Sequence, residues 1–173
     1  MRGMTYLLGG VVALAALAAS TLSAPVRADD AAAPVFGIRI PLGYRDWRLI
    51  SVAHEAGNLN DFRAILGNDV AIQAIAENQI DPWPDGTEFA KVAWHQQQDE
   101  EGIIRPGTFF QVEFMIRDSQ KYSATKGWGW ARWRGTDLKP YGQNALFTRE
   151  CVGCHNPLVK TNYVFTAPLR GQP

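Results

Sequence analysis

Hydrophobic and polar residues alternate along several stretches of this chain, which is the pattern of strands that bury one face of a sheet. Charged loops and loops rich in proline and glycine separate these stretches from one another. The alternation predicts five strands, over residues 44–53, 61–66, 87–97, 108–117 and 128–135. Strands therefore dominate the chain from residue 44 to residue 135.

Helical periodicity is confined to shorter stretches. Residues 69–78 place four apolar side chains on one side of a predicted helix, and Asn68 stands at its N-cap position. A short helix capped by Asp118 is predicted over residues 118–125, and the last long element, over residues 139–155, is predicted to be helical. Several strands with a few helices predict an α+β class, one domain around an antiparallel sheet.

The first 28 residues differ in character from the rest. Arg2, an apolar run over residues 6–19 and the small-residue sequence at 26–28 form the pattern of a cleaved secretory signal. The alternative is an uncleaved membrane anchor, but the run is short for a bilayer and lacks flanking stop-transfer charges. We expect a signal peptide over 1–28, a single domain over 29–173, a periplasmic location and no membrane span after cleavage.

The composition of the predicted mature chain excludes some partners. Removal of the signal takes away Arg2 and Arg27 but no acidic residue, which leaves a slight acidic excess. We therefore expect neither nucleic acid nor an anionic membrane as a partner. All six tryptophans and all eight phenylalanines lie beyond residue 28, which suits a core built around a flat apolar object but also any sheet-rich core.

The strongest chemical signal is Cys-Val-Gly-Cys-His at residues 151–155, which contains both cysteines of the chain. Cys-x-x-Cys-His is the pattern of c-type haem attachment. Two thiols three positions apart can each add to a vinyl group on one haem edge, and the next residue then offers its imidazole to the iron. The motif predicts one covalently bound haem c, held by Cys151 and Cys154, with His155 as the axial iron ligand.

Other interpretations of the motif need partners that the sequence hardly offers. A redox dithiol would favour a thioredoxin-like βαβ context, which the predicted strands do not form. A zinc site would need two further ligands, for which His54 and His95 remain. A sixth iron ligand in an electron-transfer cytochrome is usually methionine or a second histidine, and Met115, His54 and His95 are the candidates. An open or weakly held sixth position, suited to a small molecule, is favoured.

Four stretches of the chain resemble the cytochrome P-460 family, which includes the closely related cytochromes c′-beta. They are YRDW at 44–47, DGT at 85–87 with a lysine four residues after the threonine, VEFMIRDSQKY at 112–122 and ECVGCHNPLVKTNYVFT at 150–166. The last stretch is the most specific, and the resemblance covers nearly the whole predicted mature chain.

The resemblance implies an exported, sheet-rich homodimer with one haem c per chain and an open distal side. Members of the P-460 kind oxidise hydroxylamine to nitrous oxide or nitric oxide, and we expect the electrons to pass to a soluble acceptor such as another cytochrome c. Members of the c′-beta kind bind nitric oxide and are associated with its storage, sensing or detoxification. A lysine nitrogen bonded to a meso carbon of the haem separates the two kinds. A plain electron-transfer cytochrome is the third hypothesis.

The resemblance also assigns residues. Lys91 falls at the position of the cross-linking lysine, Glu113 at that of a distal carboxylate, and Phe62 near that of a distal phenylalanine. The thioethers fall on Cys151 and Cys154, and the proximal iron ligand falls on His155.

Strand alternation supports a buried setting for two of these residues. It places Lys91 with Phe89 and Ala93, where burial would supply a neutral, nucleophilic amine. It places Glu113 on one face with Phe109, Gln111 and Met115. Enclosure beside a haem would raise the pKa of Glu113 and suit it to accept protons from hydroxylamine.

Simpler interpretations of the same residues stay open. Lys91 can reach solvent along its aliphatic stem, and Glu113 can lie on the wetter face of a half-buried strand. Phe62 is more simply explained as a core residue. We expect the tryptophans at 128, 130 and 133 to lie in the core rather than to form a path for electrons.

Overall fold

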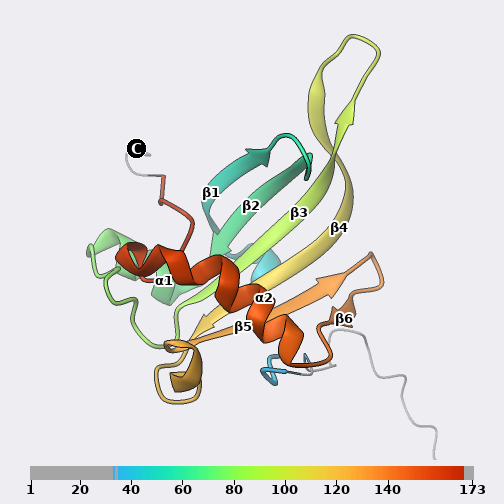
Figure 1. Ribbon diagram of the computed structural model, residues 1–173. Coiled ribbons are helices and arrows are strands. Elements are labelled where there is room, and N and C mark those ends of the chain that lie inside the picture. The colour runs from blue at the N-terminus through green and yellow to red at the C-terminus, as the bar shows by residue number, and fades with distance from the viewer. Residues whose placement is uncertain (1–32, 34, 170–173) are drawn as a thin grey trace, which may run out of the picture.

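The computed structural model describes residue 33 and residues 35–169, which form one domain around a six-stranded antiparallel sheet (Figure 1). The strands are adjacent in chain order, from β1 at one edge to β6 at the other. Their bounds are Arg48–Glu55 (β1), Asp61–Gly67 (β2), Glu88–Gln98 (β3), Ile104–Arg117 (β4), Trp128–Arg134 (β5) and Lys139–Tyr141 (β6). The predicted α+β class with an antiparallel sheet is confirmed, whereas the predicted signal peptide lies outside the described residues.

Two α-helices accompany the sheet, α1 over Asp69–Ala76 and α2 over Ala145–His155. The predicted cap of α1 is present, because Asn68 Oδ1 accepts from the backbone N–H of Ala71 at 3.0 Å. Within the described residues, no helix is long and apolar enough to span a membrane.

Three sequence predictions differ from the structure. Tyr44–Asp46 forms a 3-10 turn after Gly43, whose φ of 72° breaks the extended backbone, so β1 begins only at Arg48. The predicted helix over 118–125 contains only a 3-10 turn at Ser123–Thr125. Lys139–Tyr141 is a strand rather than the start of the last helix, because it pairs with the end of β5.

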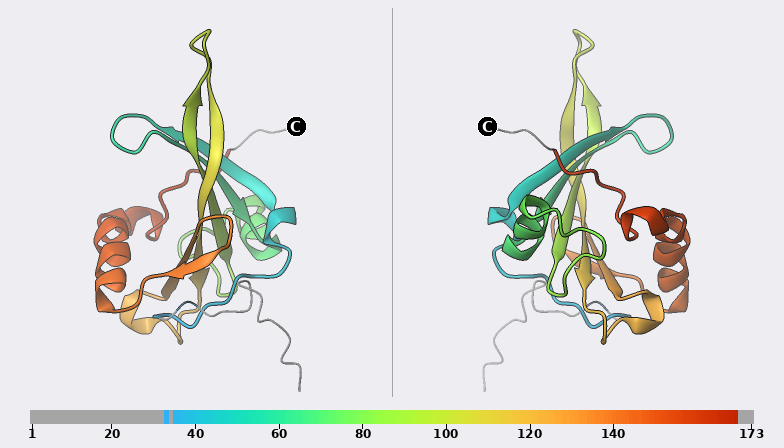
Figure 2. Two further views of the ribbon diagram at one scale, coloured as in Figure 1. Left: turned by 90° about the vertical axis from the view of Figure 1, so that its right-hand side faces the viewer. Right: turned by 90° about the vertical axis from the view of Figure 1, so that its left-hand side faces the viewer.

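The sheet has two faces with different cover (Figure 2). One, here called the α2 face, is covered by helix α2, which packs through Phe147 and Cys151. The other, here called the apolar face, is covered by Ile38, Ile40 and Tyr44 from the segment before β1. Sheet residues of the α2 face are Phe89, Lys91, Glu113, Met115, Trp130 and Arg132, and those of the apolar face are Ala90, Val92, Val112, Phe114 and Trp133.

A bulge changes the faces near the middle of β4. Ala93 pairs with Gln111, but the next residue of β3, Trp94, pairs with Phe109. The shift turns Phe109 toward the apolar face, where it packs against the core. The prediction that Phe109 shares a face with Glu113 is therefore wrong, because a one-residue bulge reverses the alternation beyond it.

Candidate functional site

A row of directly paired residues crosses the α2 face from β2 to β5. Ile65 pairs with Lys91, Lys91 with Glu113, and Glu113 with Arg132. Because side chains of directly paired residues in antiparallel strands lie on the same face, the three charged groups become neighbours. The fold thus brings together the lysine and the glutamate that the sequence analysis singled out.

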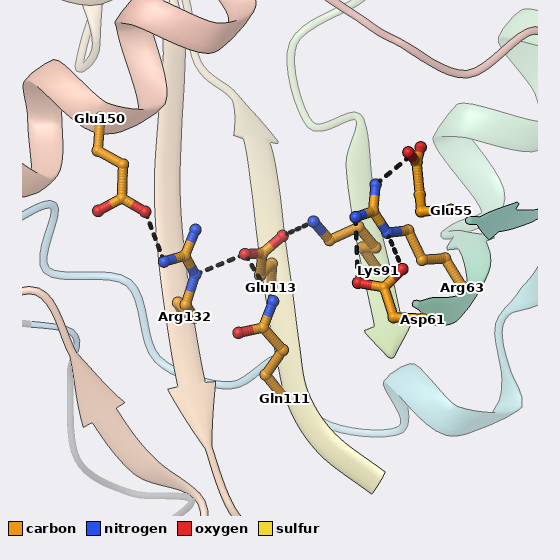
Figure 3. Close-up of polar contacts among 8 residues, drawn as sticks. All are labelled: Glu55, Asp61, Arg63, Lys91, Gln111, Glu113, Arg132 and Glu150. Atoms are coloured by element: carbon orange, nitrogen blue, oxygen red, sulfur yellow. Dashed lines mark hydrogen bonds and ion pairs between the residues drawn. The ribbon is translucent and has the colours of Figure 1, made fainter. Parts of the chain in front are cut away.

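Ion pairs join this row into a continuous chain of charges (Figure 3). Glu113 accepts from Lys91 Nζ through one carboxylate oxygen and from Arg132 Nε through the other. Gln111 Nε2 donates to the second oxygen as well, at 3.1 Å. Arg132 Nη1 donates to Glu150 Oε1 at 2.7 Å. Since Glu150 lies on α2, the chain of charges runs from the middle of the sheet to the helix.

The pKa of Glu113 reflects this setting. Burial favours the neutral acid, but the Lys91 ammonium and the Arg132 guanidinium outweigh burial, and the pKa lies below its ordinary value. The direction is opposite to that expected from enclosure alone, because the two flanking cations favour the carboxylate. Glu113 is a carboxylate of which 17% of the side chain is exposed.

Helix α2 presents the Cys-x-x-Cys-His motif next to this row. Cys151 is buried against the α2 face, Cys154 is exposed, and both are free thiols. Burial raises the pKa of the Cys151 thiol to about 12. His155 follows Cys151 by four residues, so the two lie on neighbouring turns of one side of the helix.

One hydrogen bond fixes the form of the His155 ring. Its Nδ1 lies 2.6 Å from the backbone oxygen of Tyr163. Because a carbonyl oxygen can only accept, Nδ1 carries the proton, and the lone pair of Nε2 is left for another partner. Burial lowers the pKa of His155, although the bond to Tyr163 acts in the opposite direction. The ring is therefore held as a neutral imidazole, the form that binds metals.

The residues around the motif fit an attached haem. Two free thiols lie one helical turn apart, and a neutral imidazole with an available Nε2 follows directly. The Trp130 ring lies 5.5 Å from the His155 ring, between centroids, and its indole nitrogen is buried without a hydrogen-bond partner. Such an orphaned buried donor is a group that a bound cofactor can satisfy.

Phe62 does not join this site. It pairs with Trp94 on one side and with His54 on the other, where it stacks on the histidine ring at 4.5 Å. Alternation along β3 places Trp94 on the opposite face from Lys91. The structure therefore places Phe62 on the opposite sheet face from Lys91 and Glu113. Cross-strand pairing, which one strand does not reveal, sets its face.

Two of the other candidate iron ligands, His54 and His95, are engaged away from the motif. His54 Nε2 lies 2.7 Å from Gln96 Oε1, and the His95 ring stacks on Phe110 at 4.3 Å. Met115 is buried in the same cluster as Cys151. None of these three side chains takes part in the chain of charges.

Several residues of the site were missed from the sequence. Arg132 contacts both Glu113 and Glu150, yet an arginine between tryptophans resembles an ordinary strand residue. The sequence did offer one signal. Arg132 is two positions after Trp130 in a predicted strand, and this spacing places both side chains on the same face of the sheet. Tyr163 contributes through its backbone oxygen, for which no sequence signal exists. The tryptophans at 128, 130 and 133 are buried, as predicted.

A second ionic cluster lies beside the row, at the start of β2 (Figure 3). Arg63 donates to both carboxylate oxygens of Asp61, at 2.7 and 3.1 Å, and pairs with Glu55 at 3.1 Å. Asp61 is 3% exposed, and this arginine satisfies both of its carboxylate oxygens. The cluster extends the polar part of the α2 face toward the edge of the sheet.

The fold and the site define an α+β domain in which a helix carrying Cys-x-x-Cys-His, the pattern of c-type haem attachment, packs on a charged sheet face. A family model described as Cytochrome P460 matches residues 41–166, a range that includes Lys91, Glu113 and the whole motif. The chain belongs to the cytochrome P460 family, whose cytochromes carry haem. Comparison with curated protein sequences gave no match.

Proposed function

We propose that this protein is a periplasmic c-type cytochrome that oxidises hydroxylamine to nitrous oxide or nitric oxide. Electrons would pass to a soluble acceptor such as another cytochrome c, and the protein would act as a homodimer. One observation carries the proposal: Lys91 and Glu113 lie side by side on the sheet face that supports the Cys-x-x-Cys-His helix.

The residues of this chain would hold the haem in stated ways. Cys151 and Cys154 would supply the thioether sulfurs, and His155 would offer Nε2 to the iron. Lys91 would supply the nitrogen for a further bond to the macrocycle. When bound, the haem would supply a coordination position for hydroxylamine and the redox capacity to take up its electrons.

Glu113 would be the proton acceptor at this site. Oxidation of hydroxylamine releases protons together with electrons, so a nearby carboxylate is useful. In the structure both of its oxygens are engaged by cations. A bond that removed the charge of Lys91 would free one oxygen of Glu113 and leave Arg132 to orient the other.

The ion pair itself favours a second candidate, a nitric-oxide-binding protein of the c′-beta kind without turnover. While Lys91 is paired with Glu113, its nitrogen is occupied, and the lowered pKa makes Glu113 a weak proton acceptor. A protein that remained in this state would suit reversible binding of a small neutral ligand better than proton-coupled oxidation.

The two candidates are separated by peptide mapping and turnover on the haem-loaded protein. The enzyme hypothesis predicts a haem peptide joined to the peptide that contains Lys91, a red-shifted ferrous Soret band, and acceptor reduction on addition of hydroxylamine. The variant Lys91→Arg keeps a cation beside Glu113 but lacks the lysine amine, so it should lose the joined peptide and the turnover.

The opposite results are equally informative. A free Lys91 peptide, an ordinary high-spin c-type spectrum and nitric oxide binding without hydroxylamine turnover would favour the binding protein. In a cross-linked protein, Glu113→Gln at the parental turnover rate would remove the proton-accepting role while leaving the cross-link in place.

A further inference from the structure

We propose that Trp128 and the left-handed turn at Asn162–Tyr163 are positioning elements that set the orientation of the His155 ring. The inference depends on the proposed function only in that His155 binds the haem iron. Neither Trp128 nor the turn belongs to the ion-paired row. They form a second group of residues, which contacts His155 through the Tyr163 carbonyl.

The turn has an unusual backbone. After α2 and the 3-10 segment Asn156–Thr161, Asn162 takes φ 51° and ψ 43°, and Tyr163 follows with φ 67°. Two successive residues with side chains in the left-handed region are uncommon, since each brings its Cβ close to backbone oxygen. Such a conformation persists only where surrounding contacts hold it, and it is often connected with function.

The strained conformation aims one carbonyl group at the histidine. The Tyr163 carbonyl accepts from His155 Nδ1 at 2.6 Å. Backbone bonds close the turn itself, from Asn162 N–H to the Val159 oxygen at 3.1 Å and from Tyr163 N–H to the Leu158 oxygen at 2.8 Å. The turn is thus built so that the carbonyl faces back toward the end of α2.

Trp128 ties this turn to the sheet. Its indole N–H donates to the Asn162 carbonyl at 3.1 Å, across 34 positions of sequence. The ring is 0% exposed and stacks on Phe89 at 6.0 Å. Val164, the residue after the turn, is buried in the same cluster. The sheet, rather than the helix that carries His155, therefore fixes the position of the Tyr163 carbonyl.

Such an outer contact affects a metal-bound imidazole in a known direction. A carbonyl that accepts from Nδ1–H fixes the ring and increases electron donation from Nε2. Loss of the contact from Trp128 should let the turn relax and weaken that donation. The expected consequence is a weaker bond between iron and His155 and a higher reduction potential.

The direct test compares Trp128→Phe with Trp133→Phe in the haem-loaded protein. Both tryptophans are 0% exposed on β5, but the Trp133 indole nitrogen has no hydrogen-bond partner in the described structure. We expect Trp128→Phe to move the iron–histidine stretching band in resonance Raman spectra to lower frequency and the midpoint potential upward, with Trp133→Phe close to the parent. A folded Trp128→Phe protein with the band and potential of Trp133→Phe overturns the proposal.

A second pair of variants avoids the core, in case Trp128→Phe does not fold. Asn162→Gly and Asn162→Ala both remove the side-chain amide, but glycine accepts a left-handed backbone and alanine resists it. We expect the band of Asn162→Gly to match the parent and that of Asn162→Ala to shift downward. Equal bands in the two variants would overturn the role of the turn.

Failure of this inference differs from failure of the proposed function. If His155→Ala retains the parental iron–histidine band, His155 is not the ligand, and both the proposed function and this inference fail. If the band is lost in His155→Ala but insensitive to Trp128 and Asn162, only the positioning role fails.

Discussion

The two faces of the sheet use alternate residues of the same strands for opposite purposes. On β4, Val112 and Phe114 are 0% and 1% exposed, and they pack in a hydrophobic cluster that contains no charged side chain. Glu113 lies between them and points to the α2 face, where it meets Lys91 and Arg132. Neighbouring residues of one strand therefore lie in different settings: Val112 and Phe114 lie in the hydrophobic core, and Glu113 lies in the candidate site.

The comparison separates stability from function. Burial of each large apolar side chain on the apolar face contributes roughly 1.5–3 kcal/mol to folding. Half-buried ion pairs contribute little net stability, because desolvation of the charges opposes their attraction. The charged row on the α2 face is thus not explained by stability, which is why it marks a site.

The largest effect is expected on the apolar face. Phe114→Ala would leave a cavity where the ring packs edge-on against Tyr44 at 5.1 Å and Trp133 at 5.5 Å. We expect the free energy of unfolding to fall by about 3–5 kcal/mol, measured by denaturant titration. Phe114→Leu, which keeps most of the volume, should lose clearly less. An equal loss in both variants, or a small loss in Phe114→Ala, would contradict the assignment of stability to this face.

A smaller effect is expected one position away. Glu113→Gln removes the carboxylate from between two cations, and Arg132 would remain unpaired on that side even where Lys91 is bonded to haem. We expect a loss of about 1–3 kcal/mol at neutral pH. Glu88→Gln is the matched control, because burial raises the pKa of Glu88 and its charge is not stabilised. Destabilisation by Glu88→Gln as large as that of Glu113→Gln would contradict this account.

The same variant predicts a pH dependence with a definite sign. The folded-state pKa of Glu113 lies below the ordinary value of 4.5, so the ionised carboxylate stabilises the fold at pH above 4.5. That contribution is lost as the pH falls from about 4.5 through the lower folded-state pKa. We expect the difference in unfolding free energy between parent and Glu113→Gln to shrink over this range. A difference that stays constant to lower pH would show that the pair is not the cause.

The smallest effect is expected for an exposed ion pair at the edge strand β6. Lys139 Nζ lies 2.9 Å from Asp137 Oδ2, and the pair lowers the pKa of Asp137 and raises that of Lys139. Both groups are surrounded by solvent, which screens their attraction. We expect Asp137→Asn to leave the thermal unfolding midpoint unchanged within error. A clear shift would mean that the ionic contribution to this fold is not confined to the partly buried row of Lys91, Glu113 and Arg132.

Most of the fold could be predicted from the sequence, because strand alternation and the Asn68 cap are local signals. The errors occurred where local signals are absent. A three-residue strand such as Lys139–Tyr141 is too short to show a period, and it is defined only by its partner β5. The bulge near Gln111 is a property of two strands together, so the face of Phe109 could not be obtained from β4 alone.

The candidate site could be predicted in part. The motif at 151–155 is a local pattern, and the resemblance indicated Lys91 and Glu113. That these two are direct neighbours depends on the register between β3 and β4, which the sequence does not specify. The flanking Arg132, and with it the sign of the pKa shift of Glu113, depends in the same way on β5.

The burial of Cys151 has a consequence for the order of biosynthesis. In the folded domain its sulfur faces the sheet with 8% of the residue exposed, and its pKa of about 12 keeps it in the unreactive thiol form. Under the proposed function, bond formation at this sulfur must precede the docking of α2. Because α2 follows all six strands in the element order, the strands can form while the motif is still accessible. Attachment would then be the event that permits the last helix to close over the sheet.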